Sequence, residues 1–417
     1  MVETAPPALR LSSVTHQIRS ATLVIVRPFA AWPLALALPL LAACRVGFDR
    51  VPDGREPGPD VPPPPPLPVL SCGASPQFAL DRAMTGLAAT ATDDGYYVFT
   101  VDDNGDVHGF SYEFDGDALA AATVDAPVFS GATGTVAAID TGDGVLAAMQ
   151  YGRPDAAGTA LVPLDGRLAP RAAPQMHLAW YGLDSTVARG TSGGLAFLGQ
   201  DSSGQVVAKL VSPTGQDLGA PHVAIDAGED ANIATIVPSS AGFLVTWAAS
   251  TPSPNEVRAE LLDKQLGVVL APVTINPGAT RDAVQPRAAY AAAADRYLFV
   301  WYSKLVSGED ELRVSLRSLR DRDLVEITQF PLTLSGVLPR VIAGKDDFLV
   351  VWQDKASESG LEAARIKFDG SHGALAVSGR GGKAVGWDLV TRAGQPAVVW
   401  LEDDGTRRTM WLNALCN

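Results

Sequence analysis

Asp347-Phe348-Leu349-Val350-Val351-Trp352 is the clearest copy of a strand that recurs along the chain at a nearly constant interval. Three further copies also end in tryptophan, at Trp247, Trp301 and Trp400. Seven copies can be aligned, and their last residues are numbers 100, 149, 199, 247, 301, 352 and 400, so the steps are 48–54 residues. A period near 50 residues that is built of short strands is typical of a β-propeller with one four-stranded blade per repeat.

The strands within each repeat follow one order. A strand of small residues comes first, as in 286–290 and 339–343, and the tryptophan strand follows it. An alternating third strand such as 257–262 and a fourth strand such as 268–273 complete the repeat. We expect the small residues at the crowded axis, the bulky second strands between blades, and a third strand with one solvated side. The predicted fold class is therefore all-β, a seven-bladed propeller with four-stranded antiparallel blades.

The two ends of the repeat region complement each other. After Trp400 a single strand remains, at 409–415, so the last blade lacks its fourth strand. Residues 76–80 precede the first repeat and have no blade of their own. We expect this N-terminal strand to complete the last blade and close the ring, because closure removes open sheet edges. Cys72 and Cys416 flank these two strands, which predicts a disulfide between them in an oxidising compartment; two free thiols are the alternative.

The N-terminal segment has the features of an export signal. Residues 1–43 contain an apolar stretch that two prolines interrupt, which is too short and broken to span a membrane stably. It ends in Leu41-Ala42-Ala43-Cys44, which resembles the bacterial lipobox. This resemblance implies a lipidated Cys44 at the mature N-terminus, and an ordinary signal with a chance cysteine is the alternative. The long segment before the apolar stretch suggests a later translation start, at Val24 or Val26.

The segment after Cys44 is rich in proline. Residues 44–71 include the run Pro62 to Pro66, and consecutive prolines favour extended polyproline II. We therefore expect a semi-rigid stalk between a membrane-bound lipid and a propeller that comprises residues 72–417. A spacer explains the prolines without a dedicated binding partner.

The charge balance excludes some partners. The formal net charge is −14, with 32 basic and 46 acidic residues. Sequence-independent binding to nucleic acid needs a basic face, so we expect no nucleic-acid partner. The expected attachment to the membrane is through the lipid, and the propeller is expected to be a monomer.

Over residues 73–417 the chain resembles bacterial surface lipoproteins that carry a β-propeller of Leu-Val-Val-Trp-type repeats. The resemblance implies a place in the cell envelope, and Arg45 after the lipidated cysteine favours the outer membrane. It is structural rather than catalytic. A WD40 assignment fails because Trp387-Asp388 is a single occurrence in a different strand, and the sialidase Asp box is absent.

Two local motifs resemble known sites. Gly190-Thr191-Ser192-Gly193-Gly194 matches the Gly-x-Ser-x-Gly of hydrolases, but that motif needs a helix after the serine and here a strand follows, so we predict a turn. Asp102-Asp103-Asn104-Gly105-Asp106 resembles part of a calcium loop without its distal glutamate. An Asn-Gly hairpin turn explains this segment without metal, and calcium is the alternative.

The sequence nominates no catalytic residue, metal ligand or cofactor. The four histidines after the signal lie in separate repeats, at His108, His177, His222 and His372, and none is at zinc-ligand spacing to another. The polar residues that follow the second strands are expected to project to one face: Asp102, Arg153, Asp201, Lys304, Asp354, Lys355, Glu402 and Asp403. Their mixed charges suit a protein or glycan surface, or a merely solvated rim.

Five residues are candidates for ligand binding. His177, Trp180 and Tyr181 lie between repeats, and Arg287 and Arg340 stand in first strands. The predicted function is a non-catalytic scaffold that binds protein or carbohydrate. The alternative is a carbohydrate-active enzyme, a glycoside hydrolase or lyase, which would need carboxylates, or a histidine with a tyrosine, converging near the axis.

Overall fold

The computed structural model describes residues 77–80, 84–115, 118–152, 158–178, 181–201, 203–226, 231–250, 254–304, 310–334, 336–354, 360–377 and 382–414. Every helix or strand assigned within these ranges is a β-strand. The described part of the chain thus has no helix long and apolar enough to cross a membrane.

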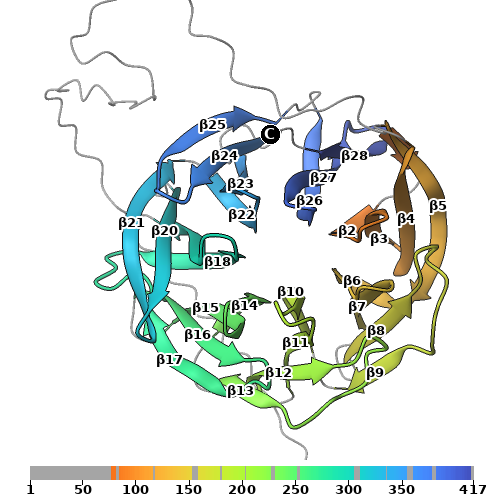
Figure 1. Cartoon of the computed structure of the whole chain (residues 1–417). Helices are drawn as coiled ribbons and strands as arrows, with labels where there is room; N and C mark the ends of the chain where they lie inside the picture. The colour runs from red at the N-terminus through yellow and green to blue at the C-terminus, as the bar shows by residue number, and fades with distance from the viewer. Residues whose placement is uncertain are drawn as a thin grey trace, which may run out of the picture. The chain divides into compact units, whose positions relative to one another are not determined.

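The strands form seven antiparallel sheets of four strands each, arranged as the blades of a propeller (Figure 1). Blade 1 contains β2 Met84–Ala91, β3 Gly95–Asp102, β4 Asp106–Asp115 and β5 Ala118–Ser130. Blade 2 contains β6 Ala132–Asp140, β7 Val145–Tyr151, β8 Gly158–Leu164 and β9 Gln175–Leu178. Blade 3 contains β10 Tyr181–Arg189, β11 Leu195–Gln200, β12 Val206–Val211 and β13 His222–Ile225. Blade 4 contains β14 Ala231–Pro238, β15 Gly242–Ala249, β16 Glu256–Asp263 and β17 Val268–Thr274. Blade 5 contains β18 Asp282–Ala291, β19 Arg296–Lys304, β20 Asp310–Arg320 and β21 Asp323–Thr333. Blade 6 contains β22 Gly336–Ala343, β23 Asp347–Asp354, β24 Leu361–Lys367 and β25 His372–Ala376. Blade 7 contains β26 Lys383–Arg392, β27 Gln395–Asp403, β28 Arg408–Ala414 and β1 Gln77–Leu80. The predicted fold class is confirmed.

The order of strands in each blade explains the composition of the repeat. The first strands are innermost and contact one another around the ring. The second strands are the most buried, and all of Leu349, Val350 and Val351 are inaccessible to solvent. The expectation for the third strand holds for β24, where exposed residues alternate with buried ones. It is wrong for β16, which is largely buried, while the fourth strand β17 carries the solvent-exposed side. The fourth strand is outermost in the sheet, so it takes the position that the alternating pattern had suggested for the third.

The cores lie between neighbouring blades. Phe299 and Trp301 of β19, for example, pack against Leu244 and Val257 of blade 4. Each such buried apolar side chain contributes on the order of 1.5–3 kcal/mol relative to an exposed one. Because every blade buries one face on each neighbour, the ring is stable as a closed set.

Short side-chain-bonded turns join many of the strands. In the β16–β17 turn, Asp263 Oδ1 accepts hydrogen bonds from the amides of Gln265 and Gly267, at 2.8 and 2.7 Å. Leu266 sits there at φ 66°, a left-handed conformation that non-glycine residues rarely adopt. Asp201 forms the same turn with Ser203 and Gln205. A turn in which an aspartate carboxylate accepts hydrogen bonds from the amides two and four residues later therefore recurs in this chain.

The ring closes as the sequence predicts. β1 pairs antiparallel with β28, with Gln77 opposite Trp411 and Leu80 opposite Arg408. The last blade is thereby completed by a strand from the other end of the repeat region. Backbone hydrogen bonds thus tie the N-terminal strand, which precedes blade 1 in the sequence, into the last blade.

Cys72 and Cys416, the predicted disulfide partners, lie outside the described residues, so their pairing stays a prediction.

We predict that Cys72 and Cys416 of the oxidised chain do not react with a thiol reagent, even after denaturation. The double substitution Cys72→Ser, Cys416→Ser should lower the free energy of unfolding by roughly 4–5 kcal/mol, because the loop that the bridge closes is nearly the whole propeller. Thiol titration and chemical denaturation test this. Two reactive thiols in the wild-type chain, or unchanged stability in the double variant, would contradict the pairing.

Candidate functional site

The first strands of all seven blades surround one axis (Figure 1). They line a cavity of about 680 Å³, here called the axial channel. Most of its wall consists of alanine, glycine, valine, leucine and isoleucine. This confirms the expectation that small residues crowd the axis. Its volume lies in the range that small-molecule sites usually have.

Five charged side chains interrupt the apolar wall of the channel: Asp140, Arg189, Arg287, Arg340 and Asp388. Three arginines against two aspartates leave the wall with one net positive charge, although the whole chain carries −14. A positive, low-dielectric cleft in an acidic protein concentrates anions. The wall therefore favours a negatively charged ligand group.

Arg287, Arg340 and Asp388 occupy equivalent positions in three consecutive blades. Each lies opposite the valine that precedes the tryptophan of its second strand. The same position is filled by Ala88 in blade 1 and by Ala137 in blade 2. The three charged groups thus lie at one level of the channel, on the side of blades 5 to 7.

A β-bulge precedes both arginines. The register shifts by one extra residue between Val284 and Arg287 in β18, and between Val337 and Arg340 in β22. The residue two positions before each arginine is in the left-handed region, with φ 49° at Gln285 and 53° at Leu338. Such strained non-glycine residues cost about 1–3 kcal/mol and cluster at functional sites.

The partners of the three charged groups differ. Asp388 Oδ2 accepts the amide hydrogen of Ala89 at 2.9 Å, so this carboxylate joins blade 7 to blade 1. Arg287 is 6% exposed, and it donates to the carbonyl of Pro286 at 3.3 Å. Arg340 is half-buried, and among the described residues no hydrogen bond or ion pair engages its guanidinium. Arg340 is thus the cation in the wall that is most available to a ligand.

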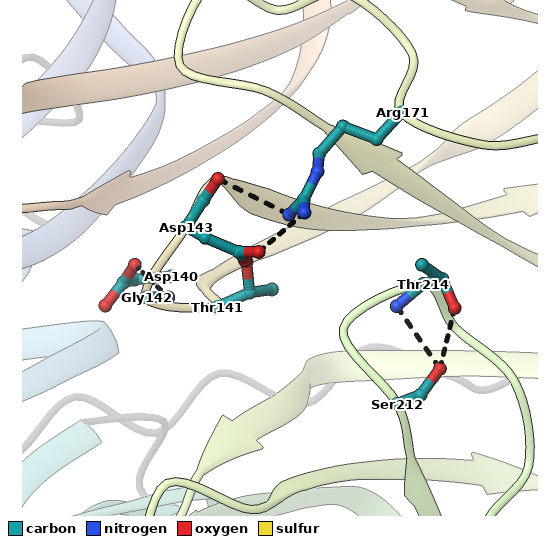
Figure 2. Close-up of polar contacts among 7 residues, drawn as sticks. All are labelled: Asp140, Thr141, Gly142, Asp143, Arg171, Ser212 and Thr214. Carbon is teal, nitrogen blue, oxygen red and sulfur yellow. Dashed lines mark hydrogen bonds and ion pairs between the residues drawn. The ribbon is translucent and has the colours of Figure 1, made fainter.

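Asp140 and Arg189 form an ion pair across blades 2 and 3, where β6 and β10 end. The β6–β7 turn holds Asp140 in place, since its Oδ1 accepts the amide of Gly142 at 2.8 Å (Figure 2). Arg171 braces the same turn through Asp143, with 2.5 Å between Nη2 and Oδ2. That hydrogen bond, and one from Thr141, lower the pKa of Asp143 to about 2. Figure 2 also shows the Ser212–Thr214 turn of blade 3, which has the same kind of side-chain bond.

Hydroxyl groups line the channel beside the charges. Tyr290 is in the wall, and its hydroxyl donates to Asp295 Oδ1 at 3.2 Å. Burial, and secondly the Asp295 charge, raise the pKa of Tyr290 to about 12. The Thr391 hydroxyl donates to the carbonyl of Ala343 at 3.1 Å. These groups are neutral at physiological pH, so they can orient a polar ligand without adding charge.

The described residues of the wall include no histidine, cysteine, glutamate or lysine. Its two carboxylates, Asp140 and Asp388, bind Arg189 and the Ala89 amide.

The predicted binding residues separate into two groups. Arg287 and Arg340 come together in the channel. His177 lies instead on β9, the outermost strand of blade 2, where its Nε2 is 3.2 Å from the carbonyl oxygen of Gly215 in blade 3. Trp180 is outside the described residues, and Tyr181 begins β10 without a described side chain. His177 is a contact between blades and is remote from the axial level.

The two motifs that resemble known sites are turns. Gly190-Thr191-Ser192-Gly193-Gly194 joins β10 to β11, with the Gly190 amide bonded to the Gly194 carbonyl at 2.8 Å. Asp102 Oδ1 accepts the amides of Asn104 and Asp106, both at 2.9 Å, and its Oδ2 is 3.3 Å from His108 Nε2. Burial opposes ionisation of Asp102, but these amides and His108 outweigh it, so the pKa of Asp102 is lowered. Within the described part of the chain, no group of three or more His, Cys, Asp or Glu residues could hold a metal ion.

The polar residues after the second strands do not all project into solvent. Asp102 and Glu402 are buried, at 5% and 7% exposure. Glu402 Oε1 accepts the amide of Gly382 at 2.7 Å. Arg153 and Lys355 lie outside the described residues. The expectation of one exposed polar face is therefore wrong for Asp102 and Glu402, because local backbone amides recruit their carboxylates.

Sequence reasoning missed Asp140, Arg189 and Asp388. Asp140 and Arg189 each end a first strand next to a glycine-containing turn, and Asp388 aligns with Arg287 and Arg340 once the hairpins are paired. A charged residue inside or at the end of a small-residue strand was the available signal.

Comparison with known proteins gives no family. No family model matches the chain, and no curated protein matches it. Among 466 matching solved chains, a provisionally assigned 6-phosphogluconolactonase from Bacteroides uniformis is similar at 14% identity and TM-score 0.47, over 70% of this chain and 85% of that one. An ancestral GH74 enzyme is similar at 11% identity and TM-score 0.48 over 81% of this chain, which spans 48% of that enzyme's length. A neuraminidase-like protein of the isolate A/little yellow-shouldered bat/Guatemala is similar at 7% identity and TM-score 0.42, over 80% of this chain and 94% of that one. Similarities this low assign no activity to the chain.

We predict that Leu338→Asn stabilises the protein by about 0.5–1 kcal/mol, because asparagine tolerates the left-handed conformation better than leucine does. Leu338 is 41% exposed, so little burial is lost. Leu334, which is 54% exposed and has no positive φ, is the matched control, and Leu334→Asn should not stabilise. Equal effects of the two substitutions in thermal denaturation would contradict the assigned strain.

Proposed function

We propose that this protein is a lipid-anchored binding propeller of the bacterial cell envelope, and that it binds an acidic glycan through the axial channel. The observation that carries the proposal is the Arg340 guanidinium, which lines the channel wall with Arg287 and has no partner among the described residues. Guanidinium groups bind carboxylates in a bidentate manner, so a uronic-acid carboxylate is a fitting ligand group.

The dimensions of the channel favour a glycan over a protein surface. A space of about 680 Å³ between seven strands admits a sugar chain but not a folded partner. The Tyr290 and Thr391 hydroxyls supply neutral polar groups further along the channel, each three residues from the charged level on its strand. A protein ligand that inserts an acidic side chain is the competing outcome.

The proposed activity is binding and not catalysis. A glycoside hydrolase or lyase would need an acid and a base free to exchange protons. The two wall carboxylates are held by Arg189 and by the Ala89 amide. These contacts support the scaffold over the enzyme.

We predict that Arg340→Gln weakens binding of an oligoglucuronate to the full chain about tenfold or more, through loss of a charge-assisted pair worth roughly 1.5–3 kcal/mol. Arg287→Gln should act in the same direction. Arg320, an exposed arginine at the end of β20 and outside the channel wall, is the matched control. Isothermal titration calorimetry with charged and neutral oligosaccharides measures the effect.

Three results would contradict this proposal. The neutral oligosaccharide could bind as well as the acidic one, or Arg320→Gln could weaken binding as much as Arg340→Gln. Turnover of the sugar that is lost in Asp140→Asn or Asp388→Asn would favour the enzyme instead.

We predict that Cys44→Ser releases the protein from the membrane fraction of the expressing bacterium, because the thiol that carries the lipid is removed. Metabolic labelling with a fatty acid should mark the wild-type chain and not the variant. Cys72→Ser is the control and should remain membrane-bound. Labelling of the Cys44→Ser chain would contradict the anchor.

A further inference from the structure

The seam between blades 4 and 5 contains a second cavity, of about 240 Å³, which we call the seam pocket. Its wall comes from the loop after β17 and from β19, β20 and β21 of blade 5. The lining residues are Asn276, Pro277, Gly278, Ala279, Thr280, Arg281, Trp301, Ser303, Arg313 and Gln329. The seam pocket is separate from the axial channel, since the two share no lining residue.

Blade 5 presents a row of polar side chains to this pocket. Trp301 and Ser303 are two residues apart on β19, and Arg313 lies directly opposite Trp301 on β20. Gln329 of β21 lies opposite Ser315, which is two residues from Arg313. Since side chains alternate between the faces of a strand, all four wall residues project from one face. That face packs against blade 4, where Trp301 is part of the shared core.

The covering loop is fixed at its start. The Ile275 amide donates to the carbonyl of Val257 at 2.7 Å, and the Val257 amide donates to Asn276 Oδ1 at 2.7 Å. Arg317 donates to the carbonyls of Ile275 and Leu324, at 2.5 and 2.7 Å. A pocket with these supports is preorganised, which reduces the entropy lost on binding.

One buried carboxylate holds two guanidinium groups at the pocket. Glu311 Oε2 accepts from Arg281 Nη1 at 2.8 Å and from Arg313 Nη1 at 3.0 Å. Glu311 is 7% exposed, while Arg281 and Arg313 are partly exposed. Each guanidinium has further N–H groups, so this trio retains one net positive charge and several donors.

Comparison of the repeats shows what blade 5 lacks. In blade 6 the indole Nε1 of Trp352 donates to Glu362 Oε2 at 2.9 Å, and Glu362 lies opposite Trp352 on the third strand. The residue opposite Trp301 is Arg313, which can only donate. Trp301 Nε1 is buried and has no acceptor among the described residues. The seam pocket thus lacks the acceptor that blade 6 supplies from its third strand.

We propose that the seam pocket binds a small carboxylate-bearing molecule, whose oxygens take the position that Glu362 fills in blade 6. The arginine pair would hold the carboxylate, with Gln329 and Ser303 available to the rest of the ligand. A volume of about 240 Å³ lies below the usual range for drug-sized ligands, so the ligand is on the scale of one sugar ring or one amino acid. This site does not depend on the proposed function of the axial channel.

The test is calorimetric titration of the full chain with glucuronate, glutamate and glucose, together with the indole N–H resonances in heteronuclear NMR. We expect saturable binding of one or both acids, weaker or no binding of glucose, and a shift of the resonance that Trp301→Phe removes. Binding of glucuronate alone would identify a sugar acid, and binding of glutamate alone an amino acid; either supports the site.

The repeats provide matched variants. Arg313→Glu builds the blade 6 arrangement into blade 5 and should reduce affinity for the acid at least about tenfold, as should Arg281→Gln. Arg258, opposite Trp247 on β16, has the equivalent position in blade 4 but is not part of the pocket, so Arg258→Glu should leave affinity unchanged. Arg340→Gln removes the cation proposed for the axial channel, so a shift of the Trp301 resonance in that variant reports on the seam pocket alone.

The proposal is overturned if no acid binds saturably, if glucose binds as tightly as the acids, or if Arg281→Gln and Arg313→Glu both retain wild-type affinity. An unmoved Trp301 resonance at saturation with acid would place the ligand elsewhere and overturn it too. Circular dichroism of each variant verifies that a loss of affinity is not a loss of fold.

Discussion

The pairing of β1 with β28 is the constraint on which the rest of the structure depends. Each blade buries its faces only against two neighbours, so an unclosed ring would expose one face of blade 7 and one of blade 1. Cluster residues from both of these blades, such as Phe110 and Met410, are buried together because the ring closes. Closure also fixes the diameter of the axial channel, since all seven first strands must then meet around one axis. The axial channel is thus a consequence of ring closure.

The charged level of the channel and the seam pocket both occur where some blades differ in sequence from the other repeats. At the axis, blades 1, 2 and 4 place alanine or threonine at the level where blades 5, 6 and 7 place Arg287, Arg340 and Asp388. At the seam, blade 6 satisfies its tryptophan internally and blade 5 does not. Function in a propeller can therefore be located where one repeat departs from the others, because the shared residues serve packing.

The sequence predicted the architecture because burial imposes it. The side chains of the tryptophan strands are buried between blades and must be apolar, so the pattern recurs in every repeat. The site could be predicted only in part. Arg287 and Arg340 were visible as charges among small residues, but a bulge before each arginine shifts the register by one residue. Counting along the sequence therefore does not reveal that Asp388 shares their level, and the ion pair of Asp140 with Arg189 depends on turns from two different blades.

A crystal structure of the full chain with a bound oligoglucuronate would show directly whether the axial channel holds an acidic glycan. We expect a sugar carboxylate in the axial channel, within hydrogen-bond distance of the Arg340 guanidinium and on the side of the channel that blades 5 to 7 form. An oligosaccharide bound on the outer strands, near His177 and β13, with the channel occupied by water alone, would contradict it.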